Sequence, residues 1–260
     1  MSADPEFFSP YPLIVGITFT NEEVLKQASE LFTKMYTLYG CNRKDSHSFF
    51  ADNLWTCAKT LGFLKEPKFV EVANKISQDN EVMRGIIWRT HTLCWAAKNA
   101  LHLEGDFVEL GTYRGDTASF IYDYVELAQT NKKFYLYDIF EPHNTSHAMP
   151  HHSAELYNTV CSRFQNCPNV KVVKGEVPLT LHEQSPEKIS FMHIDLNNAD
   201  AEMGALELLF DRVVPGGMIV FDDYGWTAYQ EQYKREYAFM LERGYRILEM
   251  PTGQGLVVKR

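Results

Sequence analysis

Two apolar segments near the C-terminal end of the chain each stop at aspartate. ISFMHID ends at Asp195, and MIVFDD ends at Asp222 and Asp223. If the segments are neighbouring parallel strands, their ends lie side by side at one sheet edge. Three carboxylates gathered there repel one another unless a cation lies between them, and oxygen ligands suit a hard ion such as magnesium. We therefore expect a divalent-cation site. The alternative is that Asp222 or Asp223 only caps a helix beginning near Thr227.

A second set of residues predicts a site for a small polar molecule. In VELGTYRG an apolar run ends at the acid Glu109, and Gly111 and Gly115 bound a turn before an amphipathic helix. Free N–H groups at the start of a helix form a cradle for a polar ligand. Dinucleotide sites need a glycine where this chain has Tyr113, so a pyrophosphate would meet a phenol ring. A nicotinamide-dependent dehydrogenase is therefore the weaker alternative.

The run FYLYD ends at another acid, Asp138. In a doubly wound sheet this end lies ~5 Å from the glycine loop, where a carboxylate can accept hydrogen bonds from both hydroxyls of a ribose. Asp138 would otherwise cap the following turn. A nucleoside-type cofactor fits this arrangement.

The loop EPHNTSHAMPHHS contains His143, His147, His151 and His152. Clustered histidines suggest a metal site, but none of them forms an H-x-x-x-H pair on a clear helix. A loop of this length between a strand and a helix is more often a mobile lid. We expect a lid from which one histidine approaches the substrate.

Bulk composition excludes several classes of protein. The 260 residues carry a net charge of -9 with a pI near 5.5, and no lysine and arginine run could follow a phosphate backbone, so no nucleic-acid partner is expected. Five cysteines without a C-x-x-C pair favour a reducing cytosol. The start, MSADPEFFSPYP, lacks the features of a secretory signal, and no apolar run is long enough to span a bilayer. We expect a cytoplasmic protein without membrane contact.

Hydrophobic periodicity indicates the elements that must hold these residues. Residues 1–103 predict an N-terminal arm and a helical cap or lid without strands, with helices over about 21–35 and 46–61, from Pro67, and from 79 to about 103. Its many aromatic residues favour a core, a lid or an oligomer interface. Residues 104–260 predict alternating strands and helices that close with a hairpin in YRILEMPTGQGLVVKR.

From about Gly105 to Arg260 the chain resembles the macrocin O-methyltransferase family, which consists of metal-dependent class I enzymes that use S-adenosylmethionine (SAM). VELGTYRG is similar to the family's cofactor loop, LYDIFE to its second acidic motif, HIDLNNADAEMGALELLFDRVVPGGMIVFDDYG to its metal segment and PTGQGLVVKR to its C-terminal hairpin. The resemblance implies a methyltransferase domain over 104–260. The implied α/β fold is Rossmann-like, with a seven-stranded, mostly parallel sheet in the order 3-2-1-4-5-7-6 and an antiparallel last strand.

The resemblance also implies roles for individual residues. Magnesium or another divalent cation would be bound by Asp195, Asp222 and Asp223. Related catechol methyltransferases have a lysine base shortly after the first metal aspartate, where this chain has Asn197 and Asn198, so the catalytic base would be Asp195 or His143. The cofactor would be held by Glu109, Gly111 and Gly115 at its methionine part, Asp138 at its ribose, and Gly175 and Glu176 near its adenine, with Thr112, Tyr113, Phe140 and Asp195 completing the set.

The expected function is transfer of a methyl group from SAM to one hydroxyl of a vicinal diol, most plausibly on a sugar of a glycoside or natural product. The mechanism would be an in-line displacement in which the cation lowers the pKa of the hydroxyl. The alternatives are a catechol or phenol O-methyltransferase, a metal-independent enzyme and a non-catalytic SAM-binding protein. The partners would be a small hydroxylated acceptor and further copies of the chain in a homo-oligomer.

Overall fold

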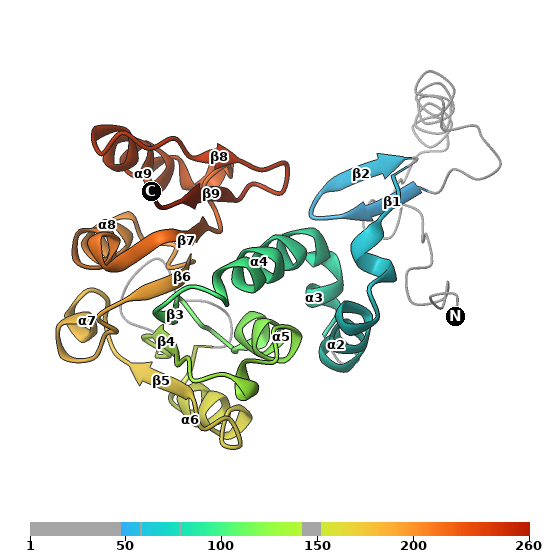
Figure 1. Cartoon of the computed structure of the whole chain (residues 1–260), viewed down its shortest axis with the longest axis horizontal. Helices are drawn as coiled ribbons and strands as arrows, with labels where there is room; N and C mark the ends of the chain where they lie inside the picture. The colour runs from blue at the N-terminus through green and yellow to red at the C-terminus, as the bar shows by residue number, and fades with distance from the viewer. Residues whose placement is uncertain (1–47, 58, 78–79, 142–151) are drawn as a thin grey trace.

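The computed structural model describes residues 48–57, 59–77, 80–141 and 152–260. Its centre is a seven-stranded sheet, in which β3 to β7 are parallel and β9 runs antiparallel to both of its neighbours (Figure 1). Numbered along the chain, the strand order is 3-2-1-4-5-7-6, so the predicted fold is confirmed. The strands, in spatial order, are β5 (Val170–Lys174), β4 (Phe134–Asp138), β3 (Asp106–Leu110), β6 (Ile189–Ile194), β7 (Val213–Phe221), β9 (Gly255–Val258) and β8 (Leu248–Glu249).

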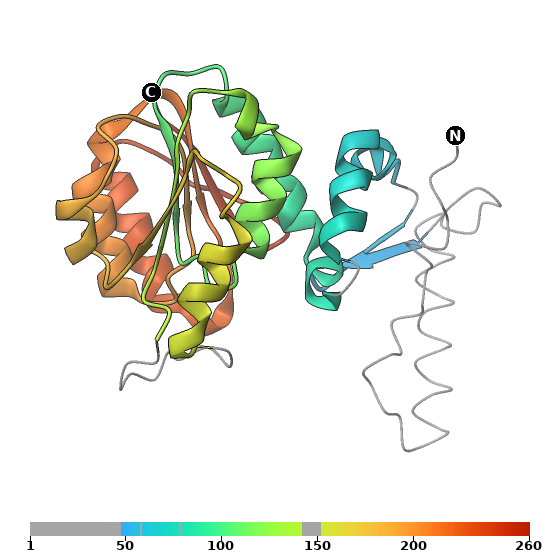
Figure 2. The ribbon, with the colours of Figure 1, turned by 90° about the horizontal axis from the view of Figure 1, so that it is seen from below.

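Helices cover both faces of this sheet, as Figure 2 shows in side view. The strands between them are buried on both faces: every residue of β4 and of β6 is buried, as expected for parallel strands in an α/β protein. One face carries α4 (Ile87–Ala100), α5 (Asp116–Tyr124) and α6 (Ala154–Arg163), and the other carries α7 (Leu179–Glu183), α8 (Ala199–Leu209) and α9 (Gln230–Glu242).

The remaining described helices do not belong to these two sets. Helix α2 (Pro67–Ser77) packs on α5, and α3 (Glu81–Gly85) leads into α4. Four single turns of 3₁₀ helix lie between longer elements, namely η1 (Gly62–Lys65), η2 (Leu127–Gln129), η3 (Phe210–Arg212) and η4 (Thr227–Tyr229). No helix in the described part of the chain is long and apolar enough to cross a membrane.

The helix predicted over 46–61 is wrong. The segment forms an antiparallel hairpin of β1 (Ser48–Ala51) and β2 (Leu54–Cys57). Its two-residue turn has Asp52 at φ 51° and Asn53 at φ 56°. Two positive φ angles are what a tight hairpin turn requires, and aspartate and asparagine tolerate them better than most residues. The prediction that this region lacks strands is therefore also wrong.

The long helix predicted from 79 to 103 is divided in two. Helix α3 ends at Gly85, and Ile86 has φ -109° and ψ 26°, outside the helical range, before α4 begins. The hairpin turn stabilises this break, because the Asp52 N–H donates to the Gly85 carbonyl and the Asp52 carboxylate accepts from the first-turn N–H of Trp88, at 2.7 Å for each bond. Asp52 therefore caps α4 from a distant part of the sequence.

Helix α4 belongs to the layer on the sheet, next to α5, whereas β1, β2 and α2 lie on the far side of these helices from the sheet (Figures 1 and 2). Residues 1–47, which include the predicted arm and first helix, lie outside the described residues. The division of the chain near residue 103 stays a prediction.

Candidate active site

The ends of β3, β6 and β7 form one edge of the sheet. The last residue of β6, Ile194, is in register with the last residues of β3 and β7. The next residue of each strand is therefore Gly111, Asp195 or Asp222, and these three lie side by side. Backbone hydrogen bonds fix them, because the Asp195 N–H donates to the Leu110 carbonyl at 2.7 Å and the Asp222 N–H donates to the Ile194 carbonyl at 2.9 Å.

The loop after β3 is held close to this edge. Gly111 has φ +91°, and a Cβ there would lie 1.8 Å from the carbonyl oxygen of Asp195, so no larger residue fits. Tyr113, at φ +49°, donates its N–H to the Asp138 carboxylate at 2.6 Å. Gly115, at φ +73°, begins α5. The loop thus keeps its backbone against the strand ends and presents its outer side to the cavity.

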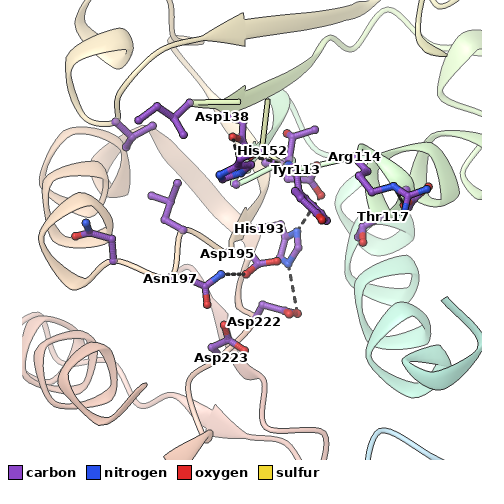
Figure 3. A pocket seen from close by; sticks show the side chains of 18 of the residues that line it. Tyr113, Arg114, Thr117, Asp138, His152, His193, Asp195, Asn197, Asp222 and Asp223 are labelled. Carbon is purple, nitrogen blue, oxygen red and sulfur yellow. Dashed lines mark hydrogen bonds and ion pairs between the residues drawn. The ribbon is translucent and has the colours of Figure 1, made fainter. Parts of the chain in front are cut away.

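A cavity of about 870 Å³ opens above these strand ends (Figure 3). One half adjoins the glycine loop and contains most of the predicted cofactor residues. The other half adjoins α3, α4 and the ends of β6 and β7. The first half is lined by Glu109, Gly111, Thr112, Tyr113, Asp138, Glu141, His152, Gly175 and Glu176, and the second by Val82, Met83, Ile86, Arg89, Leu93, Asp195, Asn197, Asn198, Asp222, Asp223 and Tyr229.

Most residues that the sequence predicted for the site line this one cavity, with three exceptions. Gly115 forms the turn behind the cavity wall, where a Cβ would meet the ring of Phe164 at 2.8 Å. Phe140 is fully buried and packs its ring on Tyr157, so its side chain does not line the cavity; its neighbours Ile139 and Glu141 do. The third, His143, lies outside the described residues.

Asp138 has backbone partners at both carboxylate oxygens. Oδ2 accepts from the Tyr113 N–H, and Oδ1 accepts from the Phe140 N–H at 2.7 Å. The Nε2 atom of His152 lies 3.7 Å from Oδ1, and the His152 ring stands edge-on to Tyr113. Asp138 therefore orders the loops around the cavity, and its contact with a ribose stays a prediction that would use its remaining lone pairs.

The three aspartates form a cluster of buried negative charge. Burial, together with the charges of Asp222 and Asp223, raises the pKa of Asp195 well above its usual value. Burial and the charge of Asp222 raise the pKa of Asp223 to about 7. Burial alone would also raise the pKa of Asp222, but His193 and Arg89 lower it to about 2. Asp222 is thus the carboxyl that ionises most readily, and Asp195 and Asp223 form no ion pair with arginine or lysine in the described chain.

Arg89 of α4 is a site residue that sequence reasoning missed. Its Nη1 atom lies 2.5 Å from Oδ2 of Asp222, and its Nε donates to Oδ1 of Asp52 at 3.2 Å. Its side chain is only 12% exposed, so both ion pairs are shielded from water. Asp222 therefore has an arginine partner, which departs from the prediction that all three aspartates are left for a cation.

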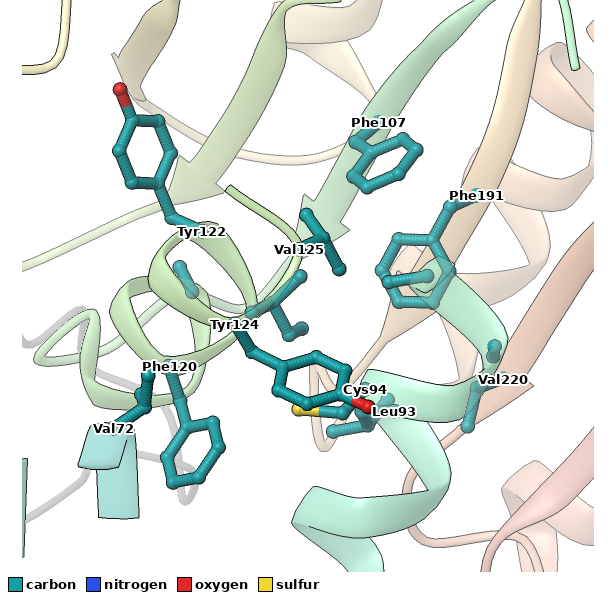
Figure 4. Close-up of a cluster of buried hydrophobic side chains, with 14 of the residues drawn as sticks. Val72, Leu93, Cys94, Phe107, Phe120, Tyr122, Tyr124, Val125, Phe191 and Val220 are labelled. Carbon is teal, nitrogen blue, oxygen red and sulfur yellow. The ribbon is translucent and has the colours of Figure 1, made fainter. Parts of the chain in front are cut away.

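The core beneath Arg89 holds α4 in place. Leu93 and Cys94 are fully buried between α5 and the sheet, near Tyr124 (Figure 4). On the sheet, Phe191 and Val220 belong to the same core. The position of the guanidinium therefore depends on the packing of α4 between α5 and the sheet.

His193 is a second site residue that was missed. It lies beside Glu109 on the neighbouring strand, with Nδ1 3.0 Å from Oε1 of Glu109, and both side chains are almost completely buried. Its Nε2 atom lies 3.4 Å from Oδ1 of Asp222 (Figure 3). Burial alone would lower the pKa of His193, but Asp222 and Glu109 raise it to about 10. Burial raises the pKa of Glu109.

Asn197 occupies the place in which a lysine base was considered. It has φ +54°, a conformation that asparagine tolerates, and its Nδ2 donates to Oδ1 of Asp195 at 3.4 Å. Glu202 accepts from the preceding N–H, that of Leu196, at 3.2 Å. The segment that carries Asp195 is thus held from α8, and no lysine lines the described part of the cavity.

Several buried polar atoms along the cavity have no hydrogen-bond partner in the described chain, namely Glu109 Oε2, His193 Nε2 and Asn197 Oδ1. An unpaired buried polar group is costly, so these atoms fit bound polar or ionic partners, such as the amino-acid end of SAM at Glu109. The oxygen-rich donor set, and the lack of an arginine or lysine partner for Asp195 and Asp223 in the described chain, fit a divalent cation.

Solved structures of several methyltransferases share this fold. The structure of the O-methyltransferase NovP matches with a TM-score of 0.58 at 16% identity, covering 67% of this chain and 81% of that one. CalS11, a TDP-rhamnose 3'-O-methyltransferase of calicheamicin biosynthesis, matches with a TM-score of 0.54 at 14% identity, covering 74% and 95%. The SAH-bound Podospora anserina methyltransferase PaMTH1 matches with a TM-score of 0.54 at 14% identity, covering 94% and 99%. At these identities the matches establish the fold. No curated protein matches the sequence.

The strand order and the acid-and-glycine loop beside the aspartate edge define a class I methyltransferase. The chain belongs to the macrocin-O-methyltransferase (TylF) family, whose model matches residues 91–240, more than half of its 260 residues. It is thus an O-methyltransferase with SAM as its methyl donor, as the sequence motifs predicted.

Proposed function

We propose that this enzyme methylates one hydroxyl of a vicinal diol on a small molecule, namely a sugar of a glycoside or natural product, with a divalent cation bound at Asp195, Asp222 and Asp223. The observation that carries the proposal is the cluster of these carboxylates at the ends of β6 and β7, in the same cavity as the glycine loop that we expect to hold the methyl donor. The TylF family and the rhamnose methyltransferase CalS11 support a sugar acceptor.

The acceptor half of the cavity has a mixed character. Val82, Met83, Ile86 and Leu93 form an apolar wall from α3 and α4, and the carboxylates and Asn197 face it from the sheet edge. A polyol with an apolar aglycone fits such a surface, since its hydroxyls can meet the polar side while the aglycone covers the wall. A catechol also presents two adjacent oxygens and is the alternative acceptor.

The residues of this chain would perform three tasks in the reaction. Glu109 and the glycine loop would hold the donor within the same cavity as the acceptor. The Asp195 segment, fixed by Glu202 and Asn197, places a carboxylate where it can accept the proton of the reacting hydroxyl. The walls from α3 and α4 limit access of water. A bound divalent cation would supply a lowered pKa at that hydroxyl.

In the transfer itself, the acceptor oxygen forms a bond to the methyl carbon as the bond from that carbon to sulfur breaks. The electron pair of the broken bond stays on sulfur, which leaves S-adenosylhomocysteine (SAH), and the hydroxyl proton passes to Asp195. Placing the oxygen, carbon and sulfur in line within one cavity supplies much of the rate enhancement. His143, the second candidate base from the sequence, stays a prediction.

The experiment that tests this function measures methyl transfer from isotope-labelled SAM to a panel of acceptors. The panel contains methyl glycosides, free sugars, catechol and mono-ols of similar size, each with MgCl₂ and with EDTA. We expect transfer to vicinal diols that stops in EDTA and returns with added cation. Equal transfer in EDTA would remove the cation from the proposal, and transfer to catechol alone would establish the alternative acceptor.

We also propose that the enzyme works as a homo-oligomer without nucleic-acid or membrane partners. Tyr233, Tyr237 and Leu241 form an exposed stripe along α9, at helical spacing, and such apolar stripes support self-association. Size-exclusion chromatography with light scattering tests this. A mass of 30.0 kDa at micromolar concentration would contradict it.

A further inference from the structure

We propose that His193 is a direct ligand of the cation, together with Asp195 and Asp222, and that this nitrogen donor makes the site prefer a transition ion such as Mn²⁺ over Mg²⁺. The inference rests on the proposed function, because it names the ligands and the class of the cation at that site. It also adds a residue that the resemblance did not imply. His193, Asp195 and Asp222 each offer one ligand atom, and these atoms all lie within 4.8 Å of one another.

The first argument is the orientation of the His193 ring. Nδ1 lies 3.0 Å from Oε1 of Glu109, so Glu109 can accept its N–H while Nε2 binds a cation in place of its own proton. Metal-binding histidines characteristically donate their other ring N–H to a carboxylate or carbonyl, which fixes the tautomer and the ring. Glu109 and His193 stand in that relation.

The second argument is that Nε2 is buried and has no hydrogen bond in the part of the chain that the structure describes. The His193 side chain is 2% exposed, and the nearest carboxylate oxygen, Oδ1 of Asp222, lies 3.4 Å away, beyond the usual hydrogen-bond range. Neighbouring ligands on an octahedral ion with bonds of ~2.1 Å are separated by ~3 Å. The gap between Nε2 and Oδ1 is thus wide for a hydrogen bond, and it leaves room for an ion that has both atoms as neighbouring ligands.

The third argument concerns the other contacts of Asp222. Arg89 occupies Oδ2, and Gln254 donates from Nε2 to Oδ1 at 2.9 Å. These two bonds fix the orientation of the Asp222 carboxylate. Gln254 uses one lone pair of Oδ1, and the other lone pair of Oδ1 is available to an ion beside His193. Asp222 can thus bind an ion through one oxygen, and His193 replaces the donor that the Arg89 ion pair removes.

The choice of ion follows from the donor set. Mg²⁺ and Ca²⁺ are hard ions that take oxygen ligands, whereas imidazole suits first-row transition ions. A site with one imidazole and two carboxylates therefore favours Mn²⁺, Fe²⁺ or Co²⁺. Asp223 lines the same cavity but is not among the three closely spaced donors, so in this inference His193 takes the place among the three ligands that the proposed function gave to Asp223.

The test uses the full chain, stripped with EDTA and reloaded with one equivalent of Mn²⁺. Pulsed EPR (ESEEM) detects a directly bound imidazole as ¹⁴N modulation of the Mn²⁺ echo. We expect this modulation in the wild type, its conversion to ¹⁵N frequencies in protein labelled with ¹⁵N-histidine, and its loss in His193→Asn and His193→Gln. His182→Gln, at an exposed histidine on α7, is the matched control and should keep it.

Calorimetric titration gives a second readout. Mn²⁺ should bind at least about 10-fold more tightly than Mg²⁺ to the wild type, and the ratio should fall towards 1 in His193→Asn. Titration with SAH reports whether each variant is folded. If neither His193 variant binds SAH, the wild-type spectra and the wild-type Mn²⁺ to Mg²⁺ ratio decide the question alone.

Three results would overturn the inference. The first is that Mn²⁺ binds to the wild type but its echo shows no nitrogen modulation. The second is that the modulation persists in a folded His193 variant. The third is that the wild type binds Mg²⁺ and Mn²⁺ with equal affinity. In each case methyl transfer that still needs a divalent cation would leave the proposed function standing. Methyl transfer that is unaffected by EDTA, in a protein that binds no Mn²⁺, would instead refute both the inference and the cation of the proposed function.

Discussion

The guanidinium of Arg89 and the carboxylate of Asp222 form a buried ion pair, 2.5 Å from nitrogen to oxygen, between residues 133 positions apart in the sequence. The same guanidinium is bound to Asp52 in the turn of the β1–β2 hairpin. The hairpin, α4 and the end of β7 are therefore joined through one side chain. The Arg89 guanidinium and the carboxylates of Asp52 and Asp222 are all shielded from water, so removing one of the three leaves an uncompensated buried charge.

Replacing Asp52 with alanine should destabilise the fold. The change removes the cap of α4 at Trp88 and one of the two counterions of Arg89. Breaking a buried ion pair from one side costs about 3–5 kcal/mol, and we expect Asp52→Ala to lower the free energy of unfolding by roughly 3 kcal/mol. Urea denaturation measures this. Glu187→Gln, at an exposed acid, is the control, and equal stability of the two variants would contradict the ion-pair argument.

Replacing Asp222 with asparagine should abolish methyl transfer while cofactor binding persists. The amide keeps the shape of the side chain but removes the charge that faces Arg89, His193 and the proposed cation. Loss of several kcal/mol of transition-state stabilisation corresponds to a fall in kcat of about 10²–10³-fold. Labelled SAM measures turnover and calorimetry with SAH measures binding. Asp211→Asn, at an acid that is 95% exposed, should be fully active.

Glu202 and Glu236 give a prediction about pH. Burial, and then the neighbouring Glu202, raise the pKa of Glu236 well above its usual value. A raised pKa means that the protonated form stabilises the fold, and this contribution is present below the unfolded-state pKa and is lost as the pH rises through the folded-state pKa. Glu236→Gln keeps a neutral side chain at every pH.

The melting temperature of Glu236→Gln relative to the wild type should therefore increase as the pH rises from about 5 to about 9. Thermal unfolding monitored by circular dichroism measures the difference at each pH. Glu231→Gln, an exposed acid in the first turn of the same helix, should show a constant difference. If the difference in melting temperature between Glu236→Gln and the wild type is equally constant, the pKa of Glu236 is not raised in the folded protein.

The sequence was sufficient to predict both the sheet and the position of Asp195, Asp222 and Asp223 at its edge, because both follow from the same local pattern. Each apolar run ends at a polar residue, and parallel strands align their ends, so chain order alone placed Asp195 beside Asp222. The glycine loop was found for a similar reason. Gly111 is required where the backbone passes close to the Asp195 carbonyl, and such a requirement is visible as a glycine in the sequence.

The missed residues depend on contacts that the local pattern does not encode. Arg89 lies on a helix whose sequence gives no sign of where its side chain points, and its partners come from Asp52 and Asp222. His193 lies inside an apolar run and was taken as part of a core strand. The β1–β2 hairpin did carry a signal, since SFFA and LWTC are short runs separated by Asp52 and Asn53, but its aromatic residues suggested a helical stripe.

Gly111 offers a test of the arrangement on which the whole site depends. Gly111→Ala would place a methyl group 1.8 Å from the carbonyl oxygen of Asp195 at a backbone φ of +91°, so either the cofactor loop or the end of β6 must move. We expect loss of SAH binding together with a fall of about 3 kcal/mol or more in the free energy of unfolding. Gly62→Ala is the matched control, because a Cβ there meets nothing within 4 Å, and it should change stability by less than ~0.5 kcal/mol. If Gly111→Ala binds SAH normally, the loop and the end of β6 at Asp195 are not in close contact. The cofactor loop and the aspartate cluster would then not belong to one site.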